Sequence, residues 1–399
     1  MINPASPPAF DPEAPLPGAP DPWQGSSMPA LRPGPPWAMT EMIAAEPAFA
    51  ERLLRRLAAP DSAAAQLAAA LHEAAAAGAP VRVVGCGTSE HGAQATALIL
   101  AAGLAREGFE PRVEAVQAFE AALAPQRGGL VVGISHEGGT WATNRALEAA
   151  RAAGSRTALV TVSDRSPGAA LADLVVTTEE ADQSWCHTIG YLSPVLAALA
   201  VAGHVTGKAP DAAAVRAALA AGAGGADAAE PMATRLADTS HIVVIASGAD
   251  RPAARELVLK IEEATWLPTT MRDLETFLHG HLPATDATTG LVLILADGDA
   301  LEARAERAAE ALAAAHAIGL RAAVILSDAA RAALLMAPTP AGRMPAALPV
   351  GLEGPGAALV ATAVPLQLFT ERLARARGTN PDPIRRDQAA YLEAAARVR

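Results

Sequence analysis

Three charged residues on one predicted helix have the types and spacing of an acid–base group. The stretch 251–268, "RPAARELVLKIEEATWLP", has a helical pattern that is largely apolar outside the charged positions. Glu256, Lys260 and Glu263 stand at i, i+4 and i+7, so all three project from one face. A carboxylate enclosed beside a lysine can be held ionised and oriented as a base. The alternative is a solvated face with one intrahelical Glu–Lys pair.

A histidine follows this helix in the stretch "LETFLHGHLP". Gly280 indicates a turn there, which would place His279 at an exposed corner where its imidazole can reach a ligand. His281 stands two residues further on. Two histidines with one spacer do not define a metal site, and the sequence predicts none.

Small polar residues follow three predicted strands and form a second group of candidates. The loops are "CGTSE" from residue 86, "SHEGGT" from residue 135 and "DQSWCHTIGY" over 182–191. Glycines, hydroxyls and backbone N–H groups at strand ends and helix N-termini suit an oxyanion or a sugar hydroxyl. Their convergence at one sheet edge predicts a ligand site. The candidate substrate-binding residues are Gly87, Thr88, Ser89, Ser135, His136, Glu137, Gly138, Thr140, His187 and Thr188.

Each of these loops also has a plainer interpretation. Thr88 and Ser89 would serve as ordinary helix N-caps. His136 and His187 are expected to hydrogen-bond a ligand or cap a helix rather than to act as acid–base groups. Glu137 is the unexpected member, because a carboxylate repels an anion. It would suit the hydroxyls of an unphosphorylated sugar or an ammonium group, unless its side chain turns outward.

The elements that position these residues follow an alternation of strand-like runs and alanine-rich helical stretches. Such alternation predicts crossover units and parallel sheets, an α/β fold. The pattern occurs twice, and each half begins with a strand that ends in a small polar turn, which predicts two tandem domains, each with a five-stranded parallel sheet flanked by helices. The predicted strands are 81–86, 112–116, 130–134, 157–162 and 173–178, then 241–246, 268–273, 291–295, 321–326 and 347–351.

The predicted domain organisation starts with a leader dense in Pro, Gly and small polar residues over 1–37, expected to be disordered or polyproline-like. A helix is predicted from Thr40, with this residue as its N-cap. The further ranges are a first domain over 38–206, a linker and helix over 207–233, a second domain over 234–378 and a C-terminal tail over 379–399.

Composition excludes several classes of protein. The chain has 399 residues, a formal net charge of −11 and no basic cluster, so nucleic acid is not an expected partner. The two cysteines cannot make a disulfide framework, which fits a reducing cytoplasm. The start of the chain lacks the pattern of a secretory signal. No stretch approaches the ~20 uninterrupted bulky apolar residues of a membrane span, so no membrane association is expected.

The span from about residue 40 to 399 resembles the double-domain sugar isomerase (SIS) family. "CGTS" and a strand that ends in Ser-x-x-Gly-x-Thr carry the resemblance in the first half, and residues 256–280 carry it in the second. The family includes the isomerase half of glucosamine-6-phosphate synthase, aminosugar-phosphate deaminase/isomerases and fructosamine-phosphate deglycases. The resemblance implies that Glu263 shuttles a proton, that His279 opens the sugar ring in a neighbouring subunit's site, and that Glu256 and Lys260 accompany them.

The chain also departs from the family pattern. Glu137 replaces the second serine of the family's phosphate loop, and Gly139 replaces the glutamate after its glycine. His281 stands where the family has a proline, and Ala389 where its C-terminal tail has a lysine. The leader is too short for a glutaminase domain, so glutamine-dependent amide transfer is not expected within this chain. The tail "RGTNPDPIRR" resembles the segment that closes over the sugar.

The resemblance therefore implies a cytoplasmic enzyme that isomerises an amino sugar or sugar-phosphate derivative, or releases an amine from it, by proton transfer between C1 and C2. This mechanism needs neither metal nor organic cofactor. The expected assembly is a homodimer with shared active sites. The alternative is a non-catalytic, regulatory SIS protein that binds a sugar derivative. Glu263 and His279 favour the enzyme.

Overall fold

A computed structural model of the chain describes residues 10–334, 338–339 and 341–398. It contains two five-stranded parallel sheets, in the orders β2-β1-β3-β4-β5 and β10-β9-β8-β6-β7. The two orders correspond strand for strand, with β6 to β10 in the places of β1 to β5. The predicted fold of two tandem α/β domains is confirmed.

The first sheet has buried central strands because its apolar runs are covered by helices on both faces. Its strands are β1 (Val81–Gly85), β2 (Val113–Gln117), β3 (Leu130–Ile134), β4 (Arg156–Thr161) and β5 (Leu174–Thr177). The helices that belong to it are α2 (Ala63–Ala76), α3 (Thr88–Arg106), α4 (Ala118–Leu123), α5 (Trp141–Ala152) and α6 (Ile189–Thr206), with a short 3₁₀ turn, η1 (Ala169–Leu171).

The second sheet repeats this arrangement. Its strands are β6 (His241–Ala246), β7 (Thr269–Asp273), β8 (Thr289–Leu295), β9 (Arg321–Leu326) and β10 (Gly342–Pro345). Its helices are α9 (Arg251–Thr265), α10 (Leu274–Thr276), α11 (Leu301–Ile318), α12 (Asp328–Ala333) and α13 (Pro355–Arg377), with short turns η2 (Gly248–Asp250), η3 (Phe277–His281) and η4 (Leu282–Ala284).

The last strand is not where the sequence predicted it. Residues 342–345 pair with β9, whereas the predicted run 347–351 forms a turn in which Val350 is 84% exposed. The short apolar run misled the prediction, because Pro349 cannot donate to a strand ladder.

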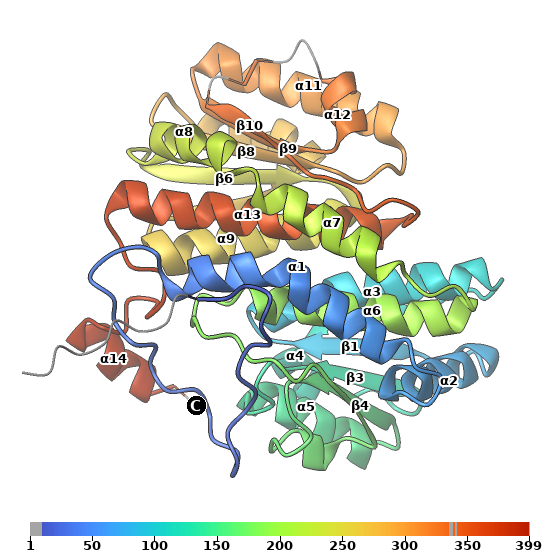
Figure 1. The fold of residues 1–399 in the computed structure, drawn as a ribbon. Helices are drawn as coiled ribbons and strands as arrows, with labels where there is room; N and C mark the ends of the chain where they lie inside the picture. Colours follow the sequence, from blue (N-terminus) through green and yellow to red (C-terminus); the bar gives the residue numbers. More distant parts are fainter. Residues whose placement is uncertain (1–9, 335–337, 340, 399) are drawn as a thin grey trace, which may run out of the picture.

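Helices from both halves form a layer between the two sheets, as Figure 1 shows. The layer contains α1 (Ala38–Leu57), α3, α6, α9 and α13, and α7 (Ala212–Ala223) packs on α1 and α13. The range predicted as a linker, 207–233, contains α7 and most of α8 (Ala226–Leu236). Because α3 and α9 touch within this layer, a site built from both halves is possible.

The N-cap of helix α1 lies three residues before the predicted one. Its N-cap is Trp37, and the Thr40 hydroxyl accepts a hydrogen bond from the Trp37 backbone N at 3.0 Å. The same hydroxyl donates to Glu371 at 2.7 Å. Thr40 therefore lies in the first turn rather than at the cap.

The leader differs from the expectation over residues 10–37, while residues 1–9 lie outside the described chain. Leu16 is buried in the main hydrophobic core, and its backbone N donates to Glu180 at 2.8 Å. The Ala181 N donates to the Pro17 carbonyl at 2.8 Å. The leader thus follows the surface of the first domain, because one apolar anchor and backbone hydrogen bonds hold a segment that its composition alone would leave loose.

Candidate functional site

The Glu256–Lys260–Glu263 stripe of helix α9 is enclosed. Lys260 and Glu256 have side chains with no exposed surface, and the Glu263 side chain is 22% exposed. Lys260 Nζ lies 2.5 Å from Glu263 Oε2 and 3.6 Å from Glu256 Oε1. Of the three, only Glu263 reaches the surface, so it is the member that can meet a ligand.

The first domain completes the polar environment of this stripe. On helix α3, the Thr88 hydroxyl donates to Glu256 Oε1 at 3.2 Å, and His91 Nδ1 lies 2.7 Å from Glu256 Oε2. Burial acts to raise the pKa of Glu256, but Lys260, His91 and Thr88 outweigh it and hold that pKa below its usual range. Burial acts to lower the pKa of Lys260, but the carboxylates beside it raise the pKa instead. Both groups are therefore charged at neutral pH.

A cavity of about 450 Å³ opens beside Glu263. Trp266 and the C-terminal residues Arg385, Arg386 and Tyr391 also line it. The Arg385 guanidinium lies over the rings of Trp266 and Tyr391, 4.5 and 4.0 Å from their centroids. Tyr391 belongs to α14 (Ala389–Ala396). The predicted tail thus lies over Glu263, and it carries arginines near the position where Ala389 replaces the family's lysine.

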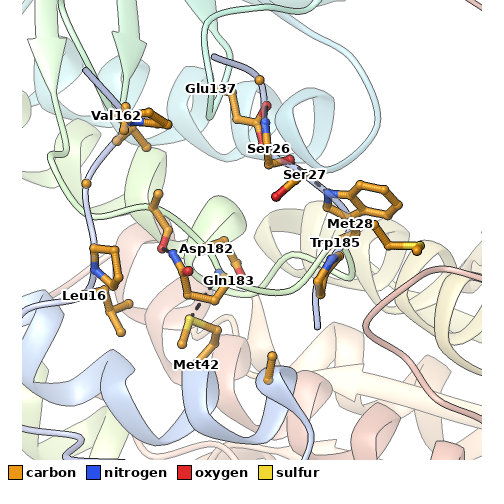
Figure 2. Close-up of a pocket in the computed structure, with 18 of the residues that line it drawn as sticks. Leu16, Ser26, Ser27, Met28, Met42, Glu137, Val162, Asp182, Gln183 and Trp185 are labelled. Carbon is orange, nitrogen blue, oxygen red and sulfur yellow. Dashed lines mark hydrogen bonds between the residues drawn. The ribbon is translucent and has the colours of Figure 1, made fainter. Parts of the chain in front are cut away.

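The loop after β3 is tightly folded. The Ser135 hydroxyl accepts from the Gly138 N at 3.2 Å and donates to the Thr140 hydroxyl at 3.2 Å. Gly138 has φ +74°, and a Cβ at this position would lie 2.1 Å from Ser166 Oγ, so only glycine fits. The Glu137 carboxylate lies beside the leader and accepts from the Ser26 N at 3.2 Å (Figure 2).

The turn after β1 contains Gly87, as expected. This glycine has φ +57° and is the N-cap of α3. Thr88 is buried and directed at Glu256, whereas the Ser89 side chain is half-buried at the start of the helix. These two residues therefore differ: the structure connects only Thr88 to the acid–base stripe.

Asp182, which was not among the candidates, organises the loop after β5. Its buried carboxylate accepts from the backbone N of Ser184, Thr188 and Gly190, at 3.1, 2.6 and 3.2 Å. Burial acts to raise the pKa of Asp182, but hydrogen bonding and the charge of His187 lower it. As an anion at neutral pH, the residue thus fixes the loop and the first turn of α6.

The two histidine rings of this region lie side by side, with centroids 5.2 Å apart. His136 Nε2 accepts from the Asp182 N at 2.9 Å, and His187 Nδ1 lies 3.7 Å from the Asp182 carboxylate. Burial and the neighbouring His187 lower the pKa of His136 to about 4, while Asp182 raises the pKa of His187 against the effect of burial. His136 is thus a neutral acceptor that supports the loop.

His279 does not lie beside Glu263 or the other residues of the α9 stripe within one chain. It lies in the kinked turn η3, is 73% exposed, and its Nε2 is 2.7 Å from Glu275 Oε1. Gly280 has φ 170°, which is extended backbone, so the expected glycine turn is a helix kink instead. Within one chain, the structure therefore places His279 on the outer face of the second domain.

Several residues that sequence reasoning missed complete the site: His91, Trp185, Arg385 and Arg386, besides Asp182. His91 stands three residues after Thr88, so a helical projection of α3 would have placed it on the same face. Trp185 connects three segments, because its indole N donates to Ser26 at 2.9 Å, its backbone N donates to Asp382 at 3.1 Å, and Arg386 lies 5.0 Å from its ring. No sequence pattern signals such a long-range meeting.

In the described part of the chain, no group of three or more His, Cys, Asp or Glu side chains is placed to hold a metal ion. One described helix, α6, is long and apolar enough to cross a membrane by length and composition, and 78% of it is buried inside the fold. Cys86 and Cys186 are both free thiols.

Comparison with known proteins agrees with this architecture. Residues 80–203 match the SIS domain family, and no curated protein matches the chain in sequence. The C-terminal domain of glucosamine-fructose-6-phosphate aminotransferase from Francisella tularensis has a similar structure, with 17% identity and a TM-score of 0.70 over 88% of this chain and 99% of that one. Tagatose-6-phosphate ketose/aldose isomerase from Escherichia coli is also similar in structure, with 18% identity and a TM-score of 0.70. The match covers 89% of this chain and 98% of that chain.

Glucosamine-6-phosphate deaminase from Thermotoga maritima is also similar, with 18% identity, a TM-score of 0.63, and coverage of 86% of this chain and 96% of that chain. The first domain thus matches the SIS domain model over residues 80–203, and the whole chain shares the tandem fold of these solved structures. The predicted resemblance is confirmed.

Proposed function

We propose that the protein is an enzyme that transfers a proton between C1 and C2 of an amino sugar or sugar-phosphate derivative, with aldose–ketose isomerisation or amine release as the outcome. The observation that carries this proposal is the buried α9 stripe, in which Glu263 alone reaches a cavity. The neighbours named as a tagatose-6-phosphate ketose/aldose isomerase and a glucosamine-6-phosphate deaminase support the same class of reaction.

In the proposed mechanism, the Glu263 carboxylate removes a proton from the carbon next to the carbonyl and returns it to the neighbouring carbon, through an enediol or enolamine. Lys260 orients Glu263 by its 2.5 Å hydrogen bond, and Glu256 balances the lysine charge. Thr88, Ser89, Ser135, Thr140 and Thr188 would bind the sugar or its anionic group.

The proton transfer gives a direct test. Sugars and aminosugars with and without a 6-phosphate are incubated with the protein in D₂O, and deuterium at C1 and C2 is followed by mass spectrometry. We expect Glu263→Gln to lower the exchange rate by about 10²–10⁴-fold while binding is retained. Glu262→Gln is the matched control, since this neighbouring carboxylate accepts from the Thr269 backbone N. A loss below tenfold in Glu263→Gln would contradict the assigned role.

His279 is proposed to open the sugar ring in the site of a second subunit, in a homodimer with shared active sites. Its 73% exposure leaves the imidazole accessible to another chain. A mixture of His279→Ala and Glu263→Gln chains should regain part of the activity, because one of the mixed sites has both residues intact. A monomer by light scattering, or no recovery on mixing, would argue against this assembly.

The alternative is a regulatory protein that binds a sugar derivative without turnover. One observation favours it: a single chain does not place His279 beside Glu263. Binding by calorimetry without any deuterium exchange across the sugar panel would support the regulatory function over the enzyme.

A further inference from the structure

The leader and the first domain enclose a cavity of about 580 Å³, shown in Figure 2. This volume lies within the ~300–1,000 Å³ range of small-molecule sites in proteins. Its inner wall is formed by the start of α1 and by the loops after β3, β4 and β5, and its outer wall by the leader residues 16–30 and Arg32. The cavity is separate from the one beside Glu263, but Trp185 and the Arg386 guanidinium over its ring lie between the two.

The leader segment 16–32, which forms the outer wall, is fixed to the domain at both ends. At one end, Leu16 is buried and its backbone N donates to Glu180. At the other end, the Arg32 guanidinium forms a bidentate ion pair with the Glu41 carboxylate, with N–O distances of 2.8 and 2.6 Å. A segment held at both ends is positioned to serve as a wall of the cavity.

The middle of this leader segment is hydrogen-bonded to the loops after β3 and β5. The Trp23 indole N donates to the Glu137 carbonyl at 3.1 Å, and the Ser26 N donates to the Glu137 carboxylate at 3.2 Å. The Trp185 indole N donates to Ser26 Oγ at 2.9 Å. Trp23 also packs so closely on Gly139 that a Cβ there would lie 3.0 Å from its ring. The leader therefore touches the polar loops at the candidate site.

The charges that line the cavity favour a cation. Glu137, Asp182 and Glu41 contribute carboxylates, and Arg32 contributes the one guanidinium among the described lining residues. Arg32 is paired with Glu41, and Asp182 is satisfied by three backbone N–H groups. Among the described residues, no cationic side chain forms an ion pair with Glu137, so its carboxylate can accept a charged ligand donor.

We propose that this cavity is a binding site for an unphosphorylated, ammonium-bearing part of the sugar derivative, and that the leader residues 16–32 form its outer wall. The proposal rests on the proposed sugar ligand and adds the charge of the group bound and the segment that binds it. Glu137 receives the ammonium, and Trp23 and Trp185 provide aromatic surface beside it.

Four probe sugars separate the effect of the amine from that of the phosphate: glucose, glucosamine, glucose 6-phosphate and glucosamine 6-phosphate. Calorimetry at pH 6.5 with the full chain should show glucosamine bound at least about tenfold more tightly than glucose or glucose 6-phosphate. Glu137→Gln keeps an acceptor for the Ser26 N but removes the charge. It should lower glucosamine affinity about tenfold, with a smaller loss at high salt. Glu302→Gln, an exposed site on α11, is the charge control.

The wall is tested by Trp23→Ala, which removes the indole contact with Gly139 and the hydrogen bond to Glu137. Glucosamine affinity should fall at least about fivefold, while Leu31→Ala, at a 54% exposed leader position outside the cavity, leaves it unchanged. Hydrogen exchange at residues 16–32 should slow when glucosamine binds. Circular dichroism checks that each variant is folded.

Tighter binding of glucose 6-phosphate than of glucosamine, or no binding of any probe, would overturn the proposal. Unchanged affinity in a folded Trp23→Ala protein, with no slowing of exchange in the leader, would also overturn the assigned wall. None of these binding results depends on turnover. Loss of the deuterium exchange expected from Glu263 would therefore contradict the proposed enzyme without deciding this inference.

Discussion

The two domains have the same strand order, yet their corresponding loops differ in what fills them. In the first domain, the loop after β3 faces a cavity under the leader. In the second domain, the loop after the corresponding strand β8 is filled by the chain itself. Arg304 of α11 pairs with Asp297, and its guanidinium lies so close to Gly248 that a Cβ there would be 2.3 Å away.

The second-domain turn is stabilised entirely by its own groups. Asp297 accepts from the Ala249 N at 2.9 Å, and the buried Asp250 accepts from the Ala296 and Asp297 N at 2.8 and 3.0 Å. In the second domain, these backbone N–H groups and the guanidinium are thus paired with the chain's own carboxylates. A duplicated fold thus provides two candidate sites, and loop side chains decide which one stays open.

The largest expected effect is on the free energy of unfolding, and it comes from removing a cation that is paired with carboxylates: Lys260 of the α9 stripe or Arg304 beside Asp297. Lys260→Met leaves Glu256 buried without its lysine, and loss of one partner of a buried pair typically costs about 3–5 kcal/mol. Arg304→Met should cost less, about 1–3 kcal/mol, because Asp297 keeps the Ala249 N–H. Urea unfolding measures both losses.

Turnover and ligand binding should distinguish the Lys260 and Arg304 variants further. Lys260→Met should abolish turnover, and Arg304→Met should leave glucosamine affinity unchanged. Equal losses of turnover in the two variants would break the distinction between the α9 stripe, whose Glu263 reaches a cavity, and the filled loop after β8.

The pH dependence of stability should have opposite signs in the two domains. The pKa of His136 is lowered to about 4, so its contribution is complete above its ordinary pKa of 6.5 and is lost as pH falls toward 4. The pKa of Asp250 is raised to about 6 from its ordinary 3.8, chiefly by burial, so its contribution is complete at low pH and is lost as pH rises through 6. Between pH 4 and 6.5 these slopes oppose each other.

Single variants should reveal each slope. Relative to the double variant, the free energy of unfolding of His136→Gln should fall by about 3 kcal/mol from pH 4 to 6.5, and that of Asp250→Asn should rise by about the same amount, at 1.36 kcal/mol per pKa unit. Urea titrations at several pH values measure this, with the double variant as the control. Parallel slopes in the two single variants would exclude this electrostatic assignment.

The leader affects the first domain through Leu16. This side chain is 6% exposed in the core, so Leu16→Ala should cost about 2 kcal/mol, at the lower end for a buried leucine, and lower the Tm by several degrees. Leu31→Ala, at the exposed leader position, is the matched control. An unchanged Tm for Leu16→Ala would mean that the leader is as loose as its composition predicts.

What the sequence could predict follows from how local each signal is. The apolar runs and the i, i+4, i+7 spacing on α9 are local patterns, so the tandem sheets and the shared face of Glu256, Lys260 and Glu263 were accessible. The position of the leader was not, because composition reports the missing core-forming residues but not the single anchor at Leu16. The filling of the second-domain loop by Arg304 depends on a tertiary contact, which no spacing reveals.

The smallest effect compares two buried serines that have the same local role. Ser135, after β3, accepts from the Gly138 N at 3.2 Å, and Ser327, after β9, accepts from the Ala330 N at 3.4 Å. Each hydroxyl thus bonds the backbone three residues on. Replacement by alanine should cost about 1 kcal/mol in either domain, the usual net value of such a hydrogen bond.

Binding should distinguish the serines although stability does not. The Ser135 hydroxyl also donates to Thr140 in the loop that carries Glu137, so Ser135→Ala should loosen this loop and weaken glucosamine binding a few-fold in calorimetry. Ser327 caps α12 in the other domain, and its alanine variant should bind as the wild type does. If Ser327→Ala weakens binding as much as Ser135→Ala does, affinity depends on overall stability rather than on the loop, and the two domains are not distinguished at this level.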